Sequence, residues 1–186
     1  MSIEGEAWEL LSSWLPVNGD PQRPRMQLAT VTGQGVPDVR TVLLSEFSPE
    51  GFWFHTDSRS RKVADLAASP QVALLLLWPD FSRQLSVQGV ASLASADEIA
   101  AAFAARTPFL QQVAWQNTDD LARLPDDERR ARWAAHVATD EPPVTWTGYL
   151  VRPTRLTFWR THEGTASRRT EFTRSSSGWS RQYLAG

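Results

Sequence analysis

The stretch RTVLLSEFSPEGFWFHTDSRSRK, residues 40–62, decides the fold. Its β-branched and apolar start predicts a strand over residues 39–44, and its aromatic middle predicts a second strand over residues 52–56. Ser48-Pro49-Glu50-Gly51 between them is a turn signal. Polar residues 57–60 then offer several N-caps for a helix that begins at Arg61. The stretch therefore predicts strand, turn, strand and helix, in that order.

Cationic and hydroxyl side chains gather at the entry to this helix. They are Arg40, Ser58, Arg59, Ser60, Arg61 and Lys62, and Lys62 is the only lysine in the chain. Such donors, placed beside the free backbone N–H groups of a helix N-terminus, suit a phosphate dianion. A solvated loop rich in arginine and serine is the alternative interpretation, and this stretch alone leaves both open.

Composition narrows the classes of function. The 186 residues are about one domain's length, and we expect a single domain over residues 1–186 with no linker or repeat. A net charge of −2 gives no global attraction to nucleic acid or to anionic membranes. The absence of cysteine excludes a thiolate metal site, and three scattered histidines argue against a histidine-rich metal centre, so we expect no metal. The start MSIEGEAWELL lacks a basic n-region, and the longest apolar run, residues 72–78, is too short to span a bilayer. We therefore expect a cytoplasmic protein that binds neither nucleic acid nor membrane.

The rest of the chain predicts an α+β protein built on a small antiparallel β-barrel. The run QVALLLLW at residues 71–78 is apolar throughout, which is typical of a strand covered on both faces. Residues 82–93 alternate polar and apolar, as a half-buried strand does. Ser95 begins a capping box for a helix that Thr107-Pro108 stops. The remaining predictions are helices over residues 3–15, 97–106 and 121–139, and strands over residues 26–32, 146–159, 168–174 and 179–183.

The order of motifs resembles the pyridoxamine 5′-phosphate oxidase family, whose fold is the FMN-binding split β-barrel. The resemblance runs from Met26 to the C-terminus, and its motifs are MQLATV (26–31), RTVLL (40–44), FHT (54–56) with SRK (60–62), LLWP (76–79), RQ (83–84), AW (114–115), WTGY (146–149) and FW (158–159). It implies a six-stranded Greek-key barrel with flanking helices, preceded by an N-terminal helix and loop over residues 1–25. It also implies that strands within residues 140–186 form a homodimer and close FMN-binding clefts between the subunits.

The resemblance implies a cofactor role for particular residues. Arg40, Arg61 and Lys62 would hold the FMN phosphate. Thr56 and the backbone of residues 42–44 would line the flavin, Gln84 would hydrogen-bond its ring system, and Trp159 and Arg169 would close the site. The full set of predicted cofactor-binding residues is Arg40, Thr41, Val42, Leu43, Leu44, His55, Thr56, Ser60, Arg61, Lys62, Gln84, Trp159 and Arg169. Gln84 as a solvated strand residue and Trp159 as a core residue remain alternatives.

Two positions depart from the family's flavin pattern. His55 stands where the family usually has tyrosine, and it keeps a donor for phosphate or ribityl oxygens. Asp119-Asp120 falls where the family has Gln-Ser near the flavin. Two carboxylates would repel a phosphate dianion, so either this loop turns away or the correspondence slips there.

The substrate positions depart much further. Where the family grips the phosphate and ring of its pyridoxine substrate, this chain has Ser45, Ala102, Arg106, Leu110, Thr165 and Ser167. Only Arg106 matches, and we predict Ser45 and Arg106 as substrate-binding residues, with no general base assigned. Lost charge-assisted hydrogen bonds, at roughly 1.5–3 kcal/mol each, disfavour a phosphorylated substrate.

The sequence therefore predicts an FMN-dependent oxidoreductase that acts on a different, bulkier and less charged compound. One alternative is a genuine pyridoxine/pyridoxamine 5′-phosphate oxidase with a rearranged substrate site, in which Arg168, Arg169 or Arg174 replaces the lost cations. Another is a non-catalytic flavin- or deazaflavin-binding protein, with Arg152, Arg155 and Arg160 as cations for a longer phosphate-containing tail.

Overall fold

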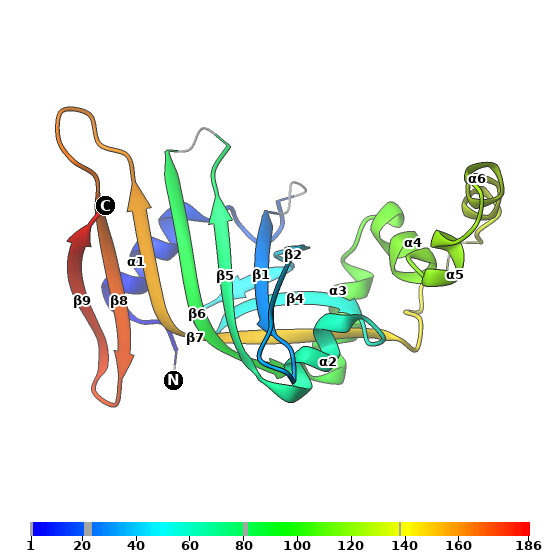
Figure 1. The fold of residues 1–186 in the computed structure, drawn as a ribbon, viewed down its shortest axis with the longest axis horizontal. Coiled ribbons are helices and arrows are strands. Elements are labelled where there is room, and N and C mark those ends of the chain that lie inside the picture. The colour runs from blue at the N-terminus through cyan, green and yellow to red at the C-terminus, as the bar shows by residue number, and fades with distance from the viewer. Residues whose placement is uncertain (1, 21–23, 80–81, 138) are drawn as a thin grey trace.

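A curled antiparallel sheet forms the body of the protein (Figure 1). The computed structural model describes residues 2–20, 24–79, 82–137 and 139–186. Over these residues the sheet has nine strands in the order β2-β1-β5-β6-β7-β4-β3, and β8 and β9 continue from β7. The strands are β1 Arg25–Val31, β2 Pro37–Leu43, β3 Glu46–Ser48, β4 Gly51–Asp57, β5 Gln71–Leu77, β6 Arg83–Leu93, β7 Trp146–Arg160, β8 Arg168–Ser175 and β9 Gly178–Ala185.

The long strand β7 makes the sheet curl and divide. Its first half, residues 146–151, pairs with β4, whereas its second half, residues 155–160, pairs with β8. Its other edge pairs with β6, where a β-bulge lies between Gln88 and Gly89. A bulge bends a strand and increases its twist. A Cβ at Gly89 would stand 2.5 Å from the carbonyl oxygen of Arg152, so this close approach requires glycine.

Six helices in the described residues flank the sheet: α1 Gly5–Trp14, α2 Arg61–Ala68, α3 Ala96–Ala104, α4 Pro108–Gln116, α5 Asp119–Ala122 and α6 Asp126–Ala134. Helix α1 lies behind the β7–β8 end of the sheet, whereas α4, α5 and α6 form an arm at the opposite end (Figure 1). Leu11 and Trp14 of α1 are buried, and the Trp14 ring meets Phe158 of β7 edge-on at 5.1 Å. None of these helices is long and apolar enough to cross a lipid bilayer.

Apart from the short strand β3, which was not predicted, the strands and the first three helices agree closely with the sequence predictions, and the split-barrel fold is confirmed. Ser95 forms the predicted capping box, in which its side chain accepts from the backbone of Glu98 and the Glu98 carboxylate accepts in return. Helix α4 was not predicted, because Thr107-Pro108 was interpreted only as a stop. Thr107 also caps the next helix, and Pro108 suits its first turn, where no partner for a backbone N–H is needed.

Two other expectations were wrong. The single charged helix over residues 121–139 is replaced by the short helices α5 and α6, because Pro125 interrupts the run and begins α6. Strand β5 is buried on one face only: Val72, Leu74 and Leu76 are buried, whereas Leu77 is 46% exposed. Although the sequence of β5 is apolar throughout, only one face of the strand is buried in a single chain, and the other face is partly exposed.

Candidate functional site

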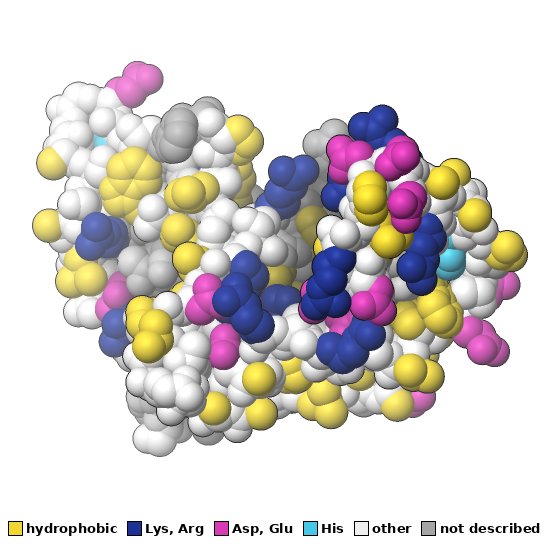
Figure 2. Space-filling view, turned by 45° about the vertical axis from the view of Figure 1, so that its right-hand side comes forward, with side chains coloured by type: hydrophobic (Ala, Val, Ile, Leu, Met, Phe, Trp, Pro, Cys, Tyr) yellow, Lys and Arg dark blue, Asp and Glu magenta, His cyan; other side chains and the backbone are white. Residues whose placement is uncertain are grey.

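A large cavity lies between the β2–β4 region, the start of α2 and the α4–α5 arm. It encloses about 550 Å³, and Figure 2 shows a hollow beside this arm with basic and acidic side chains along its rim. Its lining residues are Thr41, Val42, Leu43, His55, Thr56, Asp57, Arg59, Ser60, Lys62, Arg106, Leu110, Val113, Ala114, Asn117, Thr118, Asp119, Asp120, Ala122 and Trp146. Most of the residues predicted from the 40–62 stretch therefore meet around one cavity.

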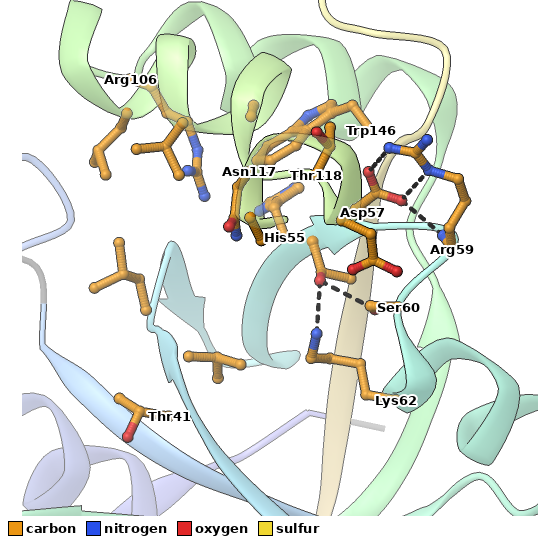
Figure 3. A pocket seen from close by; sticks show the side chains of 18 of the residues that line it. Thr41, His55, Asp57, Arg59, Ser60, Lys62, Arg106, Asn117, Thr118 and Trp146 are labelled. Carbon is orange, nitrogen blue, oxygen red and sulfur yellow. Dashed lines mark hydrogen bonds and ion pairs between the residues drawn. The ribbon is translucent and has the colours of Figure 1, made fainter. Parts of the chain in front are cut away.

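Lys62 is the central cation of this cavity. Its Nζ donates to Thr56 Oγ1 at 3.0 Å, and Thr56 Oγ1 lies 3.4 Å from the hydroxyl of the N-cap residue Ser60 (Figure 3). Burial, and next the nearby charge of Arg40, lower the pKa of the Lys62 amine below its usual value. Within the described residues, no ion pair to a carboxylate is formed by Lys62. A half-buried ammonium among hydroxyl donors therefore faces the cavity without a direct counter-charge.

Two further predicted cations, Arg40 and Arg61, do not line the cavity that Lys62 faces. The Arg40 guanidinium donates to Thr30 Oγ1 at 2.7 Å and pairs with Asp38 at 2.7 Å and Asp65 at 3.4 Å. Arg40 is absent from the cavity lining, so its charge reaches the cavity mainly as a field. The Arg61 side chain is 89% exposed, and its ion pair with Asp38 is long, at 3.7 Å. The Arg61 guanidinium therefore lies mostly in solvent.

Three carboxylates also line the cavity, and each is paired. Asp57 accepts two hydrogen bonds from the Arg59 guanidinium, at 2.7 and 3.0 Å, and these bonds hold the Asp57 pKa below its usual range. Asp119 and Asp120 begin α5 and lie 3.5 and 3.3 Å from Arg123. Both residues of this loop therefore line the cavity, and their pairing with Arg123 partly neutralises them. The two carboxylates lie at the cavity, but both are well exposed to water, which screens them.

A stacked aromatic wall closes another side of the cavity. The rings of His55 and Trp146 are 5.3 Å apart and 12° from parallel, and the Arg106 guanidinium lies 4.3 Å from the centroid of Trp146. His55 Nδ1 is 2.9 Å from the hydroxyl of Ser45. The wall therefore links the two predicted substrate residues, Ser45 and Arg106, through His55 and Trp146. The sequence motif contained Trp146, but no role was predicted for it or for Asn117 and Thr118.

The other predicted flavin residues lie in a different place. Gln84, Trp159 and Arg169 face one another across β6, β7 and β8, because Trp159 is in register with both of its neighbours. With Leu77 and Arg83 they line a pocket of about 260 Å³ that shares no lining residue with the large cavity. Leu44 belongs to neither, because its side chain is buried in the core. A single chain thus carries the predicted site in two separate parts.

Solved structures share this architecture. PhzG from Burkholderia lata 383, solved in complex with tetrahydrophenazine-1-carboxylic acid, matches with a TM-score of 0.78 at 23% identity, over 96% of this chain and 89% of that one. A pyridoxamine 5′-phosphate oxidase-related, FMN-binding protein from Nostoc punctiforme matches with a TM-score of 0.61 at 23% identity, over 88% and 87%. The fold is therefore that of the flavin-binding split-barrel proteins.

Sequence relatives specify the family. Residues 20–139 match the model described as pyridoxamine 5′-phosphate oxidase, and residues 146–186 match the C-terminal dimerisation region of pyridoxine 5′-phosphate oxidase. A pyridoxine/pyridoxamine 5′-phosphate oxidase from Rubrobacter xylanophilus is 38% identical over 168 residues, 86% of this chain and 76% of its own. One from Sphingopyxis alaskensis is 39% identical over 166 residues, with the same coverage. The chain belongs to the pyridoxamine 5′-phosphate oxidase family and is an oxidoreductase of that family.

Proposed function

We propose that this protein binds FMN in the large cavity, with the phosphate at the start of α2, and oxidises a substrate other than a pyridoxine phosphate. One observation carries the cofactor proposal: the half-buried Lys62 amine faces the cavity beside Thr56 and Ser60 and has no ion pair within the described residues. An anion there would supply the missing counter-charge. The cavity's volume of about 550 Å³ lies within the roughly 300–1,000 Å³ usual for small-molecule sites.

The residues present fit the cofactor. Thr56 and Ser60 hydroxyls and the backbone N–H groups at the start of α2 would bind phosphate oxygens together with Lys62. Exposed Arg61 would turn from its long, 3.7 Å ion pair with Asp38 toward the same group. Arg40 would act through its charge, because Asp38 and Asp65 already hold its guanidinium. Bound FMN would supply hydride transfer at its ring system. The chain's own residues would orient the ring and exclude water.

We further propose that the active form is a homodimer. A polar and aromatic surface is formed by Gln84, Trp159 and Arg169 together with half-exposed Leu77. This surface shares no lining residue with the Lys62 cavity. In a two-fold symmetric dimer this surface of one subunit would cover the cavity of the other. The match of residues 146–186 to a dimerisation region supports this arrangement.

The substrate proposal rests on the side of the cavity near α4. Arg106 lies there over the Trp146 ring, and the residues that α4 contributes to the lining are apolar, namely Leu110, Val113 and Ala114. A dianionic phosphate ester would find one guanidinium and an apolar surface. A flat ring compound with at most one negative charge would instead pack on the apolar side chains and pair with Arg106.

The names of the curated relatives favour a second candidate, oxidation of pyridoxine or pyridoxamine 5′-phosphate. The first test is an absorbance spectrum of freshly purified protein with mass spectrometry of the heat-released small molecule. Near-stoichiometric FMN is the expected result, and a colourless protein that takes up no added FMN would contradict the cofactor proposal. Turnover is then measured with pyridoxamine 5′-phosphate and with partly reduced aromatic carboxylates. Efficient turnover of the phosphate ester that Arg106→Gln abolishes would support the second candidate instead.

A further inference from the structure

A further cavity lies on the opposite face of the sheet from the Gln84 pocket, between α1 and the ends of β7 and β8. It encloses about 310 Å³, and we call it the α1 pocket. Its floor is Leu10, Trp14 and Phe158, and Arg160 and Arg168 stand at its rim. Successive side chains on a strand point to opposite faces, so these two arginines point away from their neighbours Trp159 and Arg169. The α1 pocket is therefore separate from both parts of the proposed flavin site.

The rim places like charges directly opposite one another. Arg160 on β7 is in register with Arg168 on β8, and on its other side with Arg83 on β6. Within the described residues, neither Arg160 nor Arg168 forms an ion pair with a carboxylate. Like charges on directly opposite strand residues destabilise a sheet. A bound anion between the two guanidinium groups would remove this repulsion.

Aromatic rings hold the flanking arginines in place. The Arg168 guanidinium lies 4.1 Å from the centroid of Tyr183, and that of Arg83 lies 5.5 Å from Trp14 and 5.1 Å from Trp78. These contacts leave the guanidinium N–H donors available, because a cation–π contact uses the face of the group rather than its donors. Of the two rim arginines, Arg168 is thus held against an aromatic ring, and Arg83 beside the rim is held against Trp14.

The floor is apolar and fits a ring. Trp14 is 8% exposed and Phe158 is 2% exposed, and the two rings meet edge-on at 88°. The pocket lining within the described residues contains no carboxylate. Such a floor gives inorganic phosphate nothing to contact, whereas an aromatic ring would bury its face or edge there.

We propose that the α1 pocket binds an aromatic carboxylate. Its ring lies against Trp14 and Phe158, and its carboxylate lies between Arg160 and Arg168, whose planar guanidinium groups match a planar carboxylate. His162 and Thr170 complete the lining, and the Thr170 hydroxyl offers a further donor. This site does not depend on flavin binding.

The test uses the full-length protein, saturated with FMN if it takes up FMN, and 2-naphthoate as a fluorescent probe. Saturable binding of one probe per chain is expected. Arg168→Gln should weaken it roughly tenfold or more, because a charge-assisted hydrogen bond is lost. Arg174→Gln removes the same charge from β8 outside the pocket lining and should leave it unchanged. The uncharged analogue 2-naphthol should bind roughly tenfold more weakly.

Two outcomes would overturn the proposal. One is 2-naphthoate binding that Arg168→Gln leaves at the wild-type level. The other is binding that Arg106→Gln abolishes, which would place the probe in the Lys62 cavity. Thermal unfolding of each variant tests whether a loss of probe binding results from a loss of folded protein. Without probe, Arg168→Gln should change the Tm little, since it relieves cross-strand repulsion but gives up the contact with Tyr183. With probe, the Tm should rise for wild type and Arg174→Gln but not for Arg168→Gln.

Discussion

Replacing Lys62 by glutamine should weaken FMN binding through the phosphate alone. The Lys62 amine is half-buried and 3.0 Å from Thr56 Oγ1, so part of its desolvation cost is already met before the ligand arrives. A charge-assisted hydrogen bond to phosphate is then worth about 2–3 kcal/mol, or roughly 30- to 150-fold in Kd. Riboflavin has the same ring system but no phosphate, so its affinity should change by less than about 0.5 kcal/mol.

The assay is a double comparison by flavin fluorescence quenching. Wild type and Lys62→Gln are each titrated with FMN and with riboflavin. The contribution of the phosphate contact is the loss in FMN binding free energy minus the loss in riboflavin binding free energy. Arg61→Gln is the matched control, because it removes the same charge from the adjacent residue. Its side chain is 89% exposed, so the loss of FMN affinity should be only about 0.5–1 kcal/mol.

The reasoning fails if Lys62→Gln weakens riboflavin as much as FMN, because the variant would then have damaged the cavity itself. It also fails if Lys62→Gln and Arg61→Gln lose equal FMN affinity. Equal losses would mean that the site holds phosphate only through a diffuse positive field, without a specific ammonium contact.

Three further predictions concern stability. Burial lowers the pKa of Lys62 below 10.5, so between that lowered pKa and 10.5 the unfolded chain holds a proton that the folded chain has released. The free energy of unfolding of the apoprotein, from urea titrations, should therefore rise with pH across that window, and Lys62→Gln should lack this rise. Ser95→Ala removes the N-cap of α3 and should cost about 1 kcal/mol in denaturant unfolding, whereas Ser95→Thr should restore most of it. Gly148→Ala would place a Cβ 2.5 Å from the His55 ring and should cost about 1–3 kcal/mol, with a changed near-ultraviolet circular dichroism spectrum. Gly33→Ala, whose added Cβ would meet only ordinary contacts, is the control, and equal losses in the two glycine variants would contradict the packing argument.

Local sequence signals predicted most of the helices and strands, but they did not predict where every cationic side chain lies. The hydroxyl and ammonium groups of Thr56, Ser60 and Lys62 meet as expected, because they lie within one strand-to-helix connection. Arg40 does not join them directly. Its guanidinium pairs with Asp38 at 2.7 Å and with Asp65 at 3.4 Å, and no local pattern shows that Asp65, 25 residues away on α2, will return to β1 and β2.

The α4–α5 arm shows the same limit. Thr107-Pro108 is compatible with both the end of one helix and the start of the next, and the structure has both. The carboxylates of Asp119 and Asp120 were expected to conflict with the cofactor, yet both pair with Arg123 on the following turn. Their exposure depends on where the arm lies relative to the sheet, which is a tertiary property.

The sequence by itself determined the order of most strands and helices and the cation-rich entry to α2, because periodicity, turn residues and caps act over a few neighbouring residues. The family followed from the resemblance in the order of its motifs. Only the tertiary structure decided which side chains share a cavity. Strand register separates Gln84, Trp159 and Arg169 from Lys62 and aligns Arg160 with Arg168 over Trp14. Register and helix placement result from packing between segments far apart in the chain, so no short pattern contains them.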